Sequence, residues 1–247
     1  GSGMKVSAFA ICHSGSPEQA EKDIAPLRAF GEPVMVHVEP MPYPEATDAL
    51  RKALGKTKGL QKVGVISSLG VKRDPKAVKA IAKALKDKDP DIARAAAGAL
   101  GRIGTVPANA ILTKFAKSAP AAIQDAVAEG QLAGAGMLVA DGKGNLAVPF
   151  YNALLSDQRE SVSLGALRGL ANANEAGAAA LLTKSLSGDD AVTRNFAAQL
   201  VAELPGDDLT KALTAALPSL PPAGQAALVR GLGERKDAAA RAAVVAA

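Results

Sequence analysis

The sequence predicts a mainly α-helical fold, in which a small β-α-β unit at residues 1–42 precedes an α-solenoid of about six helix pairs at 43–247. Three observations predict this fold. The chain is rich in Ala, the best helix former, and only 3% of its 247 residues are aromatic. Leucines recur at a spacing near 30 residues in the longer part, as expected for repeated helix pairs. Two apolar runs flank one helical stretch in the shorter part.

The N-terminal unit is predicted from its order of apolar and polar stretches. Residues 4–12, "MKVSAFAIC", are apolar on both faces, as in a buried strand. Ser16 and Pro17 then provide a cap and a first residue for a helix, and 32–39, "EPVMVHVE", is a second apolar run. Two strands and one helix do not make an independent core. We therefore expect this unit to cap the first helix pair, or to self-associate through its strand edges.

The clearest repeat unit is residues 74–104, "DPKAVKAIAKALKDKDPDIARAAAGALGRIG". Asp74 followed by proline is a typical helix start, and Gly104 is a typical helix end. The first helix is expected to run to Lys86. After the turn "DKDPD", the second helix is expected over 92–103.

Leucines at one position of the second helices mark the other repeats. They are Leu69, Leu100, Leu132, Leu170, Leu200 and Leu232, spaced by 31, 32, 38, 30 and 32 residues. The resulting helix pairs are 46–70, 75–104, 107–140, 145–172, 175–204 and 207–234, followed by an unpaired terminal helix. The spacing of 38 indicates a longer second helix in the third pair, ending before Gly142. Gly134 and Gly136 on that helix would let neighbouring backbones approach.

The repeat phrases resemble a known family. "LKDKDPDIARAAAGALGRIG", and more weakly "SLSGDDAVTRNFAAQLVAELPG" and "LLSDQRESVSLGALRGLA", are similar to the HEAT-like repeats of the phycobiliprotein-lyase type. This resemblance extends over residues 46–247. It implies a curved stack of helix pairs that mainly holds other proteins, and it does not imply lyase activity.

A shorter stretch resembles a second family. "APLRAFGEPVMVHVEPMPY" is similar to the substrate domain of berberine-bridge-type FAD-linked oxidases. The flavin-binding half of those oxidases is missing, and Cys12 and His13 are adjacent, unlike the well-separated residues that tether flavin in some members. We therefore expect no cofactor. Because "EPMPY" also reads as a lead-in to the helix pairs, the chain could be a fusion, or an artificial assembly without evolved function.

The composition provides no catalytic or metal-binding set. One Cys and two His are too few for a zinc site of usual composition. Cys12 and His13 are a poor nucleophilic pair, because neighbouring strand positions point to opposite faces. "DGKGN" lacks the phosphate-loop pattern, and "DKDPD" and "GDD" lack the calcium-loop pattern. We expect a protein that is not an enzyme and holds no metal.

Charge and hydropathy narrow the possible partners. The net charge is +5, but basic residues are interleaved with acidic ones and no run of five occurs, which favours solvated helix faces. No apolar run reaches about 18 residues, and no signal peptide is recognised. We expect a soluble chain that does not bind membranes.

The second helices are the expected binding surface, because they usually line the concave side of HEAT-like stacks. Two residues before each repeated leucine lie Ser67, Gly98, Gly130, Arg168, Ala198 and Arg230. The candidate partner-binding residues are Arg94, Arg102, Arg159, Arg168, Arg194 and Arg230. Guanidinium groups suit carboxylates and phosphates, although neighbouring Asp or Glu could pair with them. The sequence thus predicts a scaffold that binds a protein partner on its concave face, with nucleic acid as the alternative ligand.

Overall fold

The computed structural model describes residues 16–29, 43–235, 239–241 and 245. All the regular secondary structure in these residues is helical, and they contain no strand. The chain divides into two compact units, residues 1–46 and 47–247. Each unit is described by itself.

The predicted β-α-β unit is wrong, because the described residues form helices only and no sheet. The two stretches expected to be strands, 4–12 and 32–39, lie outside the described residues. The predicted helix between them is present as α1 (Pro17–Arg28), and the Ser16 hydroxyl accepts a hydrogen bond near its start. Self-association through strand edges is therefore not supported.

The physical reason for this correction lies in the composition of α1. A helix that covers a sheet needs an apolar stripe. Instead, α1 is polar over most of its length, carries Pro26 in its interior, and exposes most of its described side chains. A unit of two short strands with such a helix would bury too little apolar surface to be stable.

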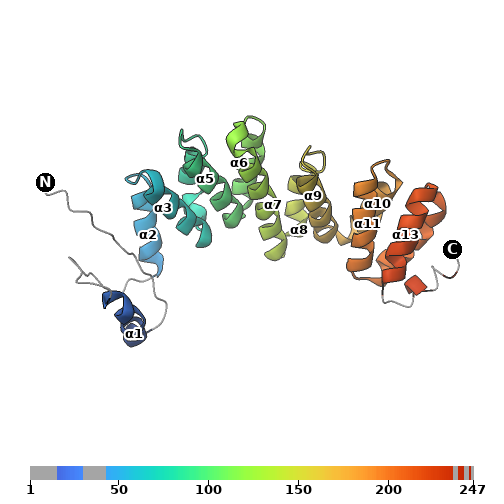
Figure 1. Ribbon diagram of the computed structural model, residues 1–247, viewed down its shortest axis with the longest axis horizontal. Helices are drawn as coiled ribbons and strands as arrows, with labels where there is room; N and C mark the ends of the chain where they lie inside the picture. The colour runs from blue at the N-terminus through green and yellow to red at the C-terminus, as the bar shows by residue number, and fades with distance from the viewer. Residues whose placement is uncertain (1–15, 30–42, 236–238, 242–244, 246–247) are drawn as a thin grey trace. The chain divides into compact units, whose positions relative to one another are not determined.

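Six consecutive helix pairs lie within residues 43–235. The pairs are α2 (Tyr43–Leu54) with α3 (Gly59–Val71), α4 (Val78–Ala84) with α5 (Pro90–Ile103), α6 (Val106–Ala116) with α7 (Gln124–Ala140), α8 (Gly144–Asn152) with α9 (Glu160–Ala173), α10 (Glu175–Ser187) with α11 (Ala191–Glu203), and α12 (Asp207–Ala216) with α13 (Pro222–Glu234). Short 3₁₀ turns, η1 (Pro75–Ala77), η2 (Ala121–Ile123) and η3 (Leu217–Ser219), adjoin α4, α7 and α12. Second helices of successive pairs pack together, α3 on α5, α5 on α7 and α7 on α9 (Figure 1).

The helix boundaries follow the capping chemistry. The Asp74 carboxylate accepts the backbone N–H two residues on at 3.0 Å, and Gly104 ends α5 with a positive φ of 64°, so both predicted signals are confirmed. The second helix of that pair begins before the predicted Ile92. Asp89 is its cap and Pro90 its first residue, because proline has no N–H that needs a partner there.

The repeated leucines form much of the core. Five of the six are buried, namely Leu69, Leu100, Leu170, Leu200 and Leu232. In α7 the core position belongs to Gln131, which is 5% exposed and donates to the Thr113 hydroxyl at 3.4 Å. Leu132, the predicted anchor, is only half-buried and packs over Gly165 of α9, where a Cβ would lie 3.2 Å from its Cδ1. The buried positions are therefore 31 residues apart from Leu100 to Gln131, and the spacing from Gln131 to Leu170 is longer.

Glycine permits the close packing of the first three second helices. A Cβ on Gly70 would lie 2.7 Å from the Ala99 Cα, and a Cβ on Gly101 would lie 2.6 Å from the Gly130 carbonyl oxygen. Real Cβ atoms do not come this close to backbone atoms. A side chain at either position would therefore force the neighbouring helix to shift.

The two glycines singled out from the sequence of α7 have different neighbours. A Cβ on Gly134 would lie 2.4 Å from the Asn109 Oδ1, and one on Gly136 would lie 3.6 Å from the Tyr151 hydroxyl. Both face side chains rather than a neighbouring backbone, so the predicted approach of backbones occurs at Gly101 and Gly130 instead. Asn109 is buried, and no described residue donates a hydrogen bond to its Oδ1.

Two expectations about chain organisation stay predictions. One is the domain division between residues 42 and 43. The other is an unpaired terminal helix, of which residues 239–241 are helical while its neighbours lie outside the described residues.

Candidate functional site

Five of the six candidate arginines lie on second helices, and the sixth, Arg159, is the N-cap residue that precedes one. Arg94 and Arg102 are on α5, Arg159 is the N-cap of α9, Arg168 is on α9, Arg194 is on α11 and Arg230 is on α13. Their environments differ, and they divide into those that hold neighbouring turns, those on an exposed patch, and one without a polar partner.

Arg94 and Arg194 bind the turns beside them. The Arg94 Nε donates to the Ala122 carbonyl oxygen in η2 at 3.3 Å, and its Nη1 pairs with Asp91 at 2.6 Å. The Arg194 Nη1 donates to the Gly188 carbonyl oxygen at 2.9 Å. Both guanidinium groups thus satisfy backbone acceptors at turns, which is a structural role.

Arg159 joins the third and fourth helix pairs. It pairs with Asp157 at 2.7 Å in its own turn and with Asp125 of α7 at 3.1 Å. The hydrogen bond from Arg159 lowers the pKa of Asp157 from its ordinary value, and the same contact raises the pKa of Arg159. Asp157 and Arg159 therefore both remain charged near neutral pH.

Arg168 and Arg230 reach the same helix from opposite sides. The Arg168 Nη1 donates to the Glu203 Oε2 at 2.5 Å, and its guanidinium carbon lies 5.2 Å from the centre of the Phe196 ring. The Arg230 Nη2 donates to the Asn195 Oδ1 at 2.8 Å. Since Asn195, Phe196 and Glu203 all belong to α11, these contacts form one surface across α9, α11 and α13.

We call this surface the arginine–aromatic patch. It consists of Arg168, Asn195, Phe196, Gln199, Glu203 and Arg230. The Gln199 amide donates to Glu203 at 2.8 Å, and the hydrogen bond from Arg168 lowers the pKa of Glu203. The side chains of Arg168 and Glu203 remain 42% and 40% exposed, so a partner can contact them directly.

Arg102 is exposed and has no hydrogen bond or ion pair with any described residue. Its guanidinium lies beside Gly98 of its own helix and near Gly70 of α3. The structure thus brings two of the six candidates, Arg168 and Arg230, to one patch.

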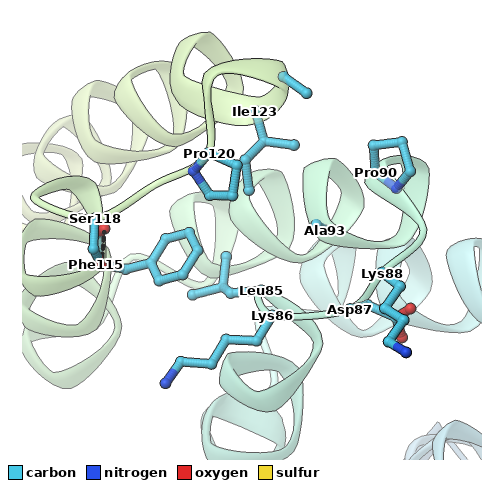
Figure 2. Close-up of a pocket in the computed structure, with 11 residues that line it drawn as sticks. Leu85, Lys86, Asp87, Lys88, Pro90, Ala93, Phe115, Ser118, Pro120 and Ile123 are labelled. Carbon is cyan, nitrogen blue, oxygen red and sulfur yellow. Dashed lines mark hydrogen bonds between the residues drawn. The ribbon is translucent and has the colours of Figure 1, made fainter.

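A groove not expected from the sequence lies between the turns of the second and third pairs. It has a volume of about 480 Å³, and Leu85, Phe115 and Ile123 form its apolar lining (Figure 2). Lys86 and Lys88 stand at its edge. Little in the sequence indicates this groove, because Phe115 is one of five phenylalanines and they do not recur at the repeat spacing.

A second groove occupies the equivalent place two repeats further on. It lies between the turns of the fourth and fifth pairs, is about 480 Å³ in volume, and is lined by Leu155, Leu167 and Leu181. Lys184 and Asp189 also line it. In the second groove the Ser163 and Ser185 hydroxyls donate to backbone carbonyl oxygens, and the Thr193 hydroxyl donates to the Asp190 carboxylate that caps α11.

The part of the chain that the structure describes was searched for metal-binding clusters and for membrane-spanning helices. No three His, Cys, Asp or Glu side chains there gather around a possible metal position. No helix there has the length and apolar character needed to cross a membrane. Cys12, His13 and His37 lie outside the described residues.

Comparison with known proteins identifies the repeat type. Residues 47–132 match HEAT repeats. The predicted HEAT-like repeats are thus confirmed for this stretch, and the HEAT fold often serves as a protein-interaction scaffold. No comparison shows a similarity to berberine-bridge-type oxidases. Among curated proteins, none matches the chain.

Similar solved structures include engineered and natural proteins. The crystal structure of an engineered protein has 20% identity and a TM-score of 0.42, covering 81% of this chain and 94% of its own. The CpcE–CpcF complex of phycocyanin lyase from Nostoc sp. PCC7120 has 18% identity and a TM-score of 0.37, covering 87% and 97%. Human deoxyhypusine hydroxylase has 23% identity and a TM-score of 0.35, covering 94% and 84%.

Proposed function

We propose that the chain is a non-enzymatic scaffold that binds a protein partner through its second helices, on the concave side of the HEAT-like stack. The arginine–aromatic patch is the observation that carries the proposal. Arginine and aromatic residues dominate the energetics of protein interfaces. Here Arg168 of α9 covers Phe196 of α11, and Arg230 lies on α13.

The patch favours a partner with acidic side chains. Arg168 pairs with Glu203 at the surface, and an exposed ion pair of this kind contributes only about 0–1 kcal/mol. A partner carboxylate can therefore replace Glu203 at low cost. The planar guanidinium would bind it edge-on through two hydrogen bonds, while the Phe196 ring lies against one of its flat faces.

Nucleic acid on the concave face has less support. Five of the six candidate arginines already donate to acceptors of this chain, and three of these five contact acidic side chains. Arg102 is the one candidate of the six that has no hydrogen bond or ion pair with a described residue. A phosphate backbone would need several such groups to be uncompensated on one surface.

The test compares two charge-reversed variants. R168E/R230E removes both arginines of the patch, whereas K143E/K211E changes the net charge equally at exposed sites elsewhere. Proteins captured by the unmodified chain from cells are compared with those captured by each variant. The partner is then purified, and its dissociation constant is measured by titration calorimetry.

We expect R168E/R230E to raise the dissociation constant of the partner by about 30-fold or more, because the loss of even one interface hot spot costs about 2 kcal/mol or more. K143E/K211E should change it by less than about two-fold. An unchanged dissociation constant for R168E/R230E would refute the assignment of the patch.

A further inference from the structure

Charge is distributed very unevenly along the solenoid. Residues 47–123, which run from the first helix pair to the turn before α7, contain 16 Lys and Arg but only 5 Asp and Glu, a formal net charge of +11. Residues 124–235 contain 8 and 12, a formal net charge of −4. The modest net charge of the whole chain conceals this asymmetry. Counting charge separately for each half would have found it in the sequence.

Most of the positive charge in the first three pairs is uncompensated. Arg51, Lys62, Arg73 and Arg94 have acidic partners. Eleven other basic side chains are exposed and have no hydrogen bond or ion pair within the described chain. They are Lys52, Lys56, Lys58, Lys76, Lys79, Lys83, Lys86, Lys88, Arg102, Lys114 and Lys117.

Ten of these eleven lie on first helices or on the turns that adjoin them. The arrangement is clearest around α4, where Lys76, Lys79, Lys83 and Lys86 follow one another at steps of three and four residues. Lys79 and Lys83 lie on one face of α4, with about 5–6 Å between their Cβ atoms, whereas Lys76 lies in η1 and Lys86 in the turn after the helix. Helix α6, which carries Lys114, packs against α4. We call these ten side chains the lysine surface.

The lysine surface is separate from the arginine–aromatic patch. The patch lies on α9, α11 and α13, whereas the lysine surface belongs to α2, α4, α6 and their turns. The sequence pattern pointed to basic residues on second helices. On the second helices of the first three pairs, Arg102 is the only described basic residue without an acidic partner or hydrogen bond.

The composition of this surface indicates the chemistry of its partner. Protein interfaces are depleted in lysine at their cores and enriched in aromatic residues and arginine. All ten groups here are lysines, and in the apolar groove beside Lys86 and Lys88 the side chains of Leu85 and Ile123 are buried while that of Phe115 is half-buried. Helices that bind membranes combine a basic face with an exposed apolar face. In α4 the apolar side chains Val78 and Ile81 are buried in the core instead.

We propose that the lysine surface binds the phosphate backbone of duplex nucleic acid, independently of sequence. A duplex presents one negative charge per about 1.7 Å of its axis, and each lysine that contacts a phosphate releases counterions. Ammonium groups on flexible stems suit such contacts because they need no fixed geometry. Contacts with phosphates carry no sequence information directly, so sequence-specific binding is not expected. This binding does not depend on the proposed protein partner.

The experiment uses the full chain and a fluorescent 20-base-pair DNA duplex, with binding measured by anisotropy at several NaCl concentrations. K79Q/K83Q/K86Q removes three charges from the lysine surface. K143Q/K184Q/K211Q removes three charges from the half with net negative charge and serves as the matched control. Circular dichroism verifies that both variants are folded, as expected for exposed positions.

The unmodified chain should bind the duplex at about 50 mM NaCl, with an affinity that falls steeply as salt increases. K79Q/K83Q/K86Q should weaken binding by about ten-fold or more and reduce the slope of log affinity against log salt by about 0.9 for each phosphate that it no longer neutralises. The control variant should bind within about two-fold of the unmodified chain.

Several results would overturn the proposal. One is no duplex binding at about 50 mM NaCl, and another is an equal loss of affinity in the two variants, which would indicate a general effect of net charge. Polyglutamate and phosphatidylserine vesicles are tested beside the duplex. If either binds more tightly than DNA and is the ligand that K79Q/K83Q/K86Q weakens, the surface serves an acidic protein or a membrane instead.

Discussion

At the scale of single residues, close contacts between second helices decide which positions tolerate change. Gly101 of α5 and Gly130 of α7 face each other, and a Cβ at either would meet backbone at 2.6 or 2.7 Å. Gly64, on the exposed side of α3, has no atom within 4 Å of the place where its Cβ would be. The same substitution should therefore have opposite effects at these positions.

We expect Gly101→Ala to lower the free energy of unfolding by about 1–3 kcal/mol, because the added methyl group forces α5 and α7 apart. Gly64→Ala should raise it by up to about 1 kcal/mol, since alanine is the better helix former. Urea unfolding followed by circular dichroism measures both. Similar stability of the two variants would contradict the helix contact at Gly101.

Residue patterns predicted the core of this protein well where one side-chain type repeats. The spacing of leucines identified five buried positions, including Leu69 and Leu232. It failed in α7, where Gln131 occupies the buried position and Leu132 lies beside it. A pattern of apolar residues cannot identify a buried amide, because its burial depends on the Thr113 hydroxyl from another helix.

At the scale of elements, the start of α9 is held by a group of charges that joins two helix pairs. Asp157 accepts hydrogen bonds from the Arg159 backbone N–H at 2.9 Å and from its guanidinium, which also reaches Asp125 of α7. The side-chain hydrogen bond from Arg159 is the main reason that the pKa of Asp157 is lowered from 3.8. Because of this connection, the free energy of unfolding should depend on pH.

The sign follows from the direction of the pKa change. A carboxyl group whose pKa is lowered by folding stabilises the folded state above its ordinary value of 3.8, and this stabilisation is lost as pH falls through the folded value. Asp157→Asn should therefore be less stable than the unmodified chain near pH 6, and the difference should shrink toward about pH 3. Urea unfolding over this range tests it. Glu129→Gln, an exposed change on α7, is the control.

Elements were predicted correctly where local signals mark both ends. Asp74 and Gly104 show this for the second pair, since capping depends on neighbouring residues alone. The N-terminal unit was predicted wrongly because the prediction relied on short apolar runs, while α1 lacks the apolar stripe that a helix covering a sheet needs. The candidate site was predicted only in part. Which arginines share a surface depends on contacts such as that between Arg168 and Glu203, 35 residues apart.

At the scale of the whole solenoid, charge and packing act against each other in its first half. Residues 47–123 share one buried core that includes Ile66, Ile81 and Leu100, yet carry a formal net charge of +11. Repulsion among exposed lysines opposes their stacking, and dissolved salt screens it. Residues 124–235, with a net charge of only −4, experience much less repulsion.

Raising NaCl from about 0.01 to 0.15 M shortens the screening length from about 30 to 8 Å. Hydrogen exchange measured by mass spectrometry should therefore slow by about three-fold or more in residues 47–123, and much less in 124–235. K79Q/K83Q/K86Q removes part of the repulsion, so its first half should respond less to salt. An equal response of the two halves would mean that lysine repulsion does not limit their stability. A large response confined to the first half would show that these helix pairs retain an electrostatic cost, which a bound polyanion would remove.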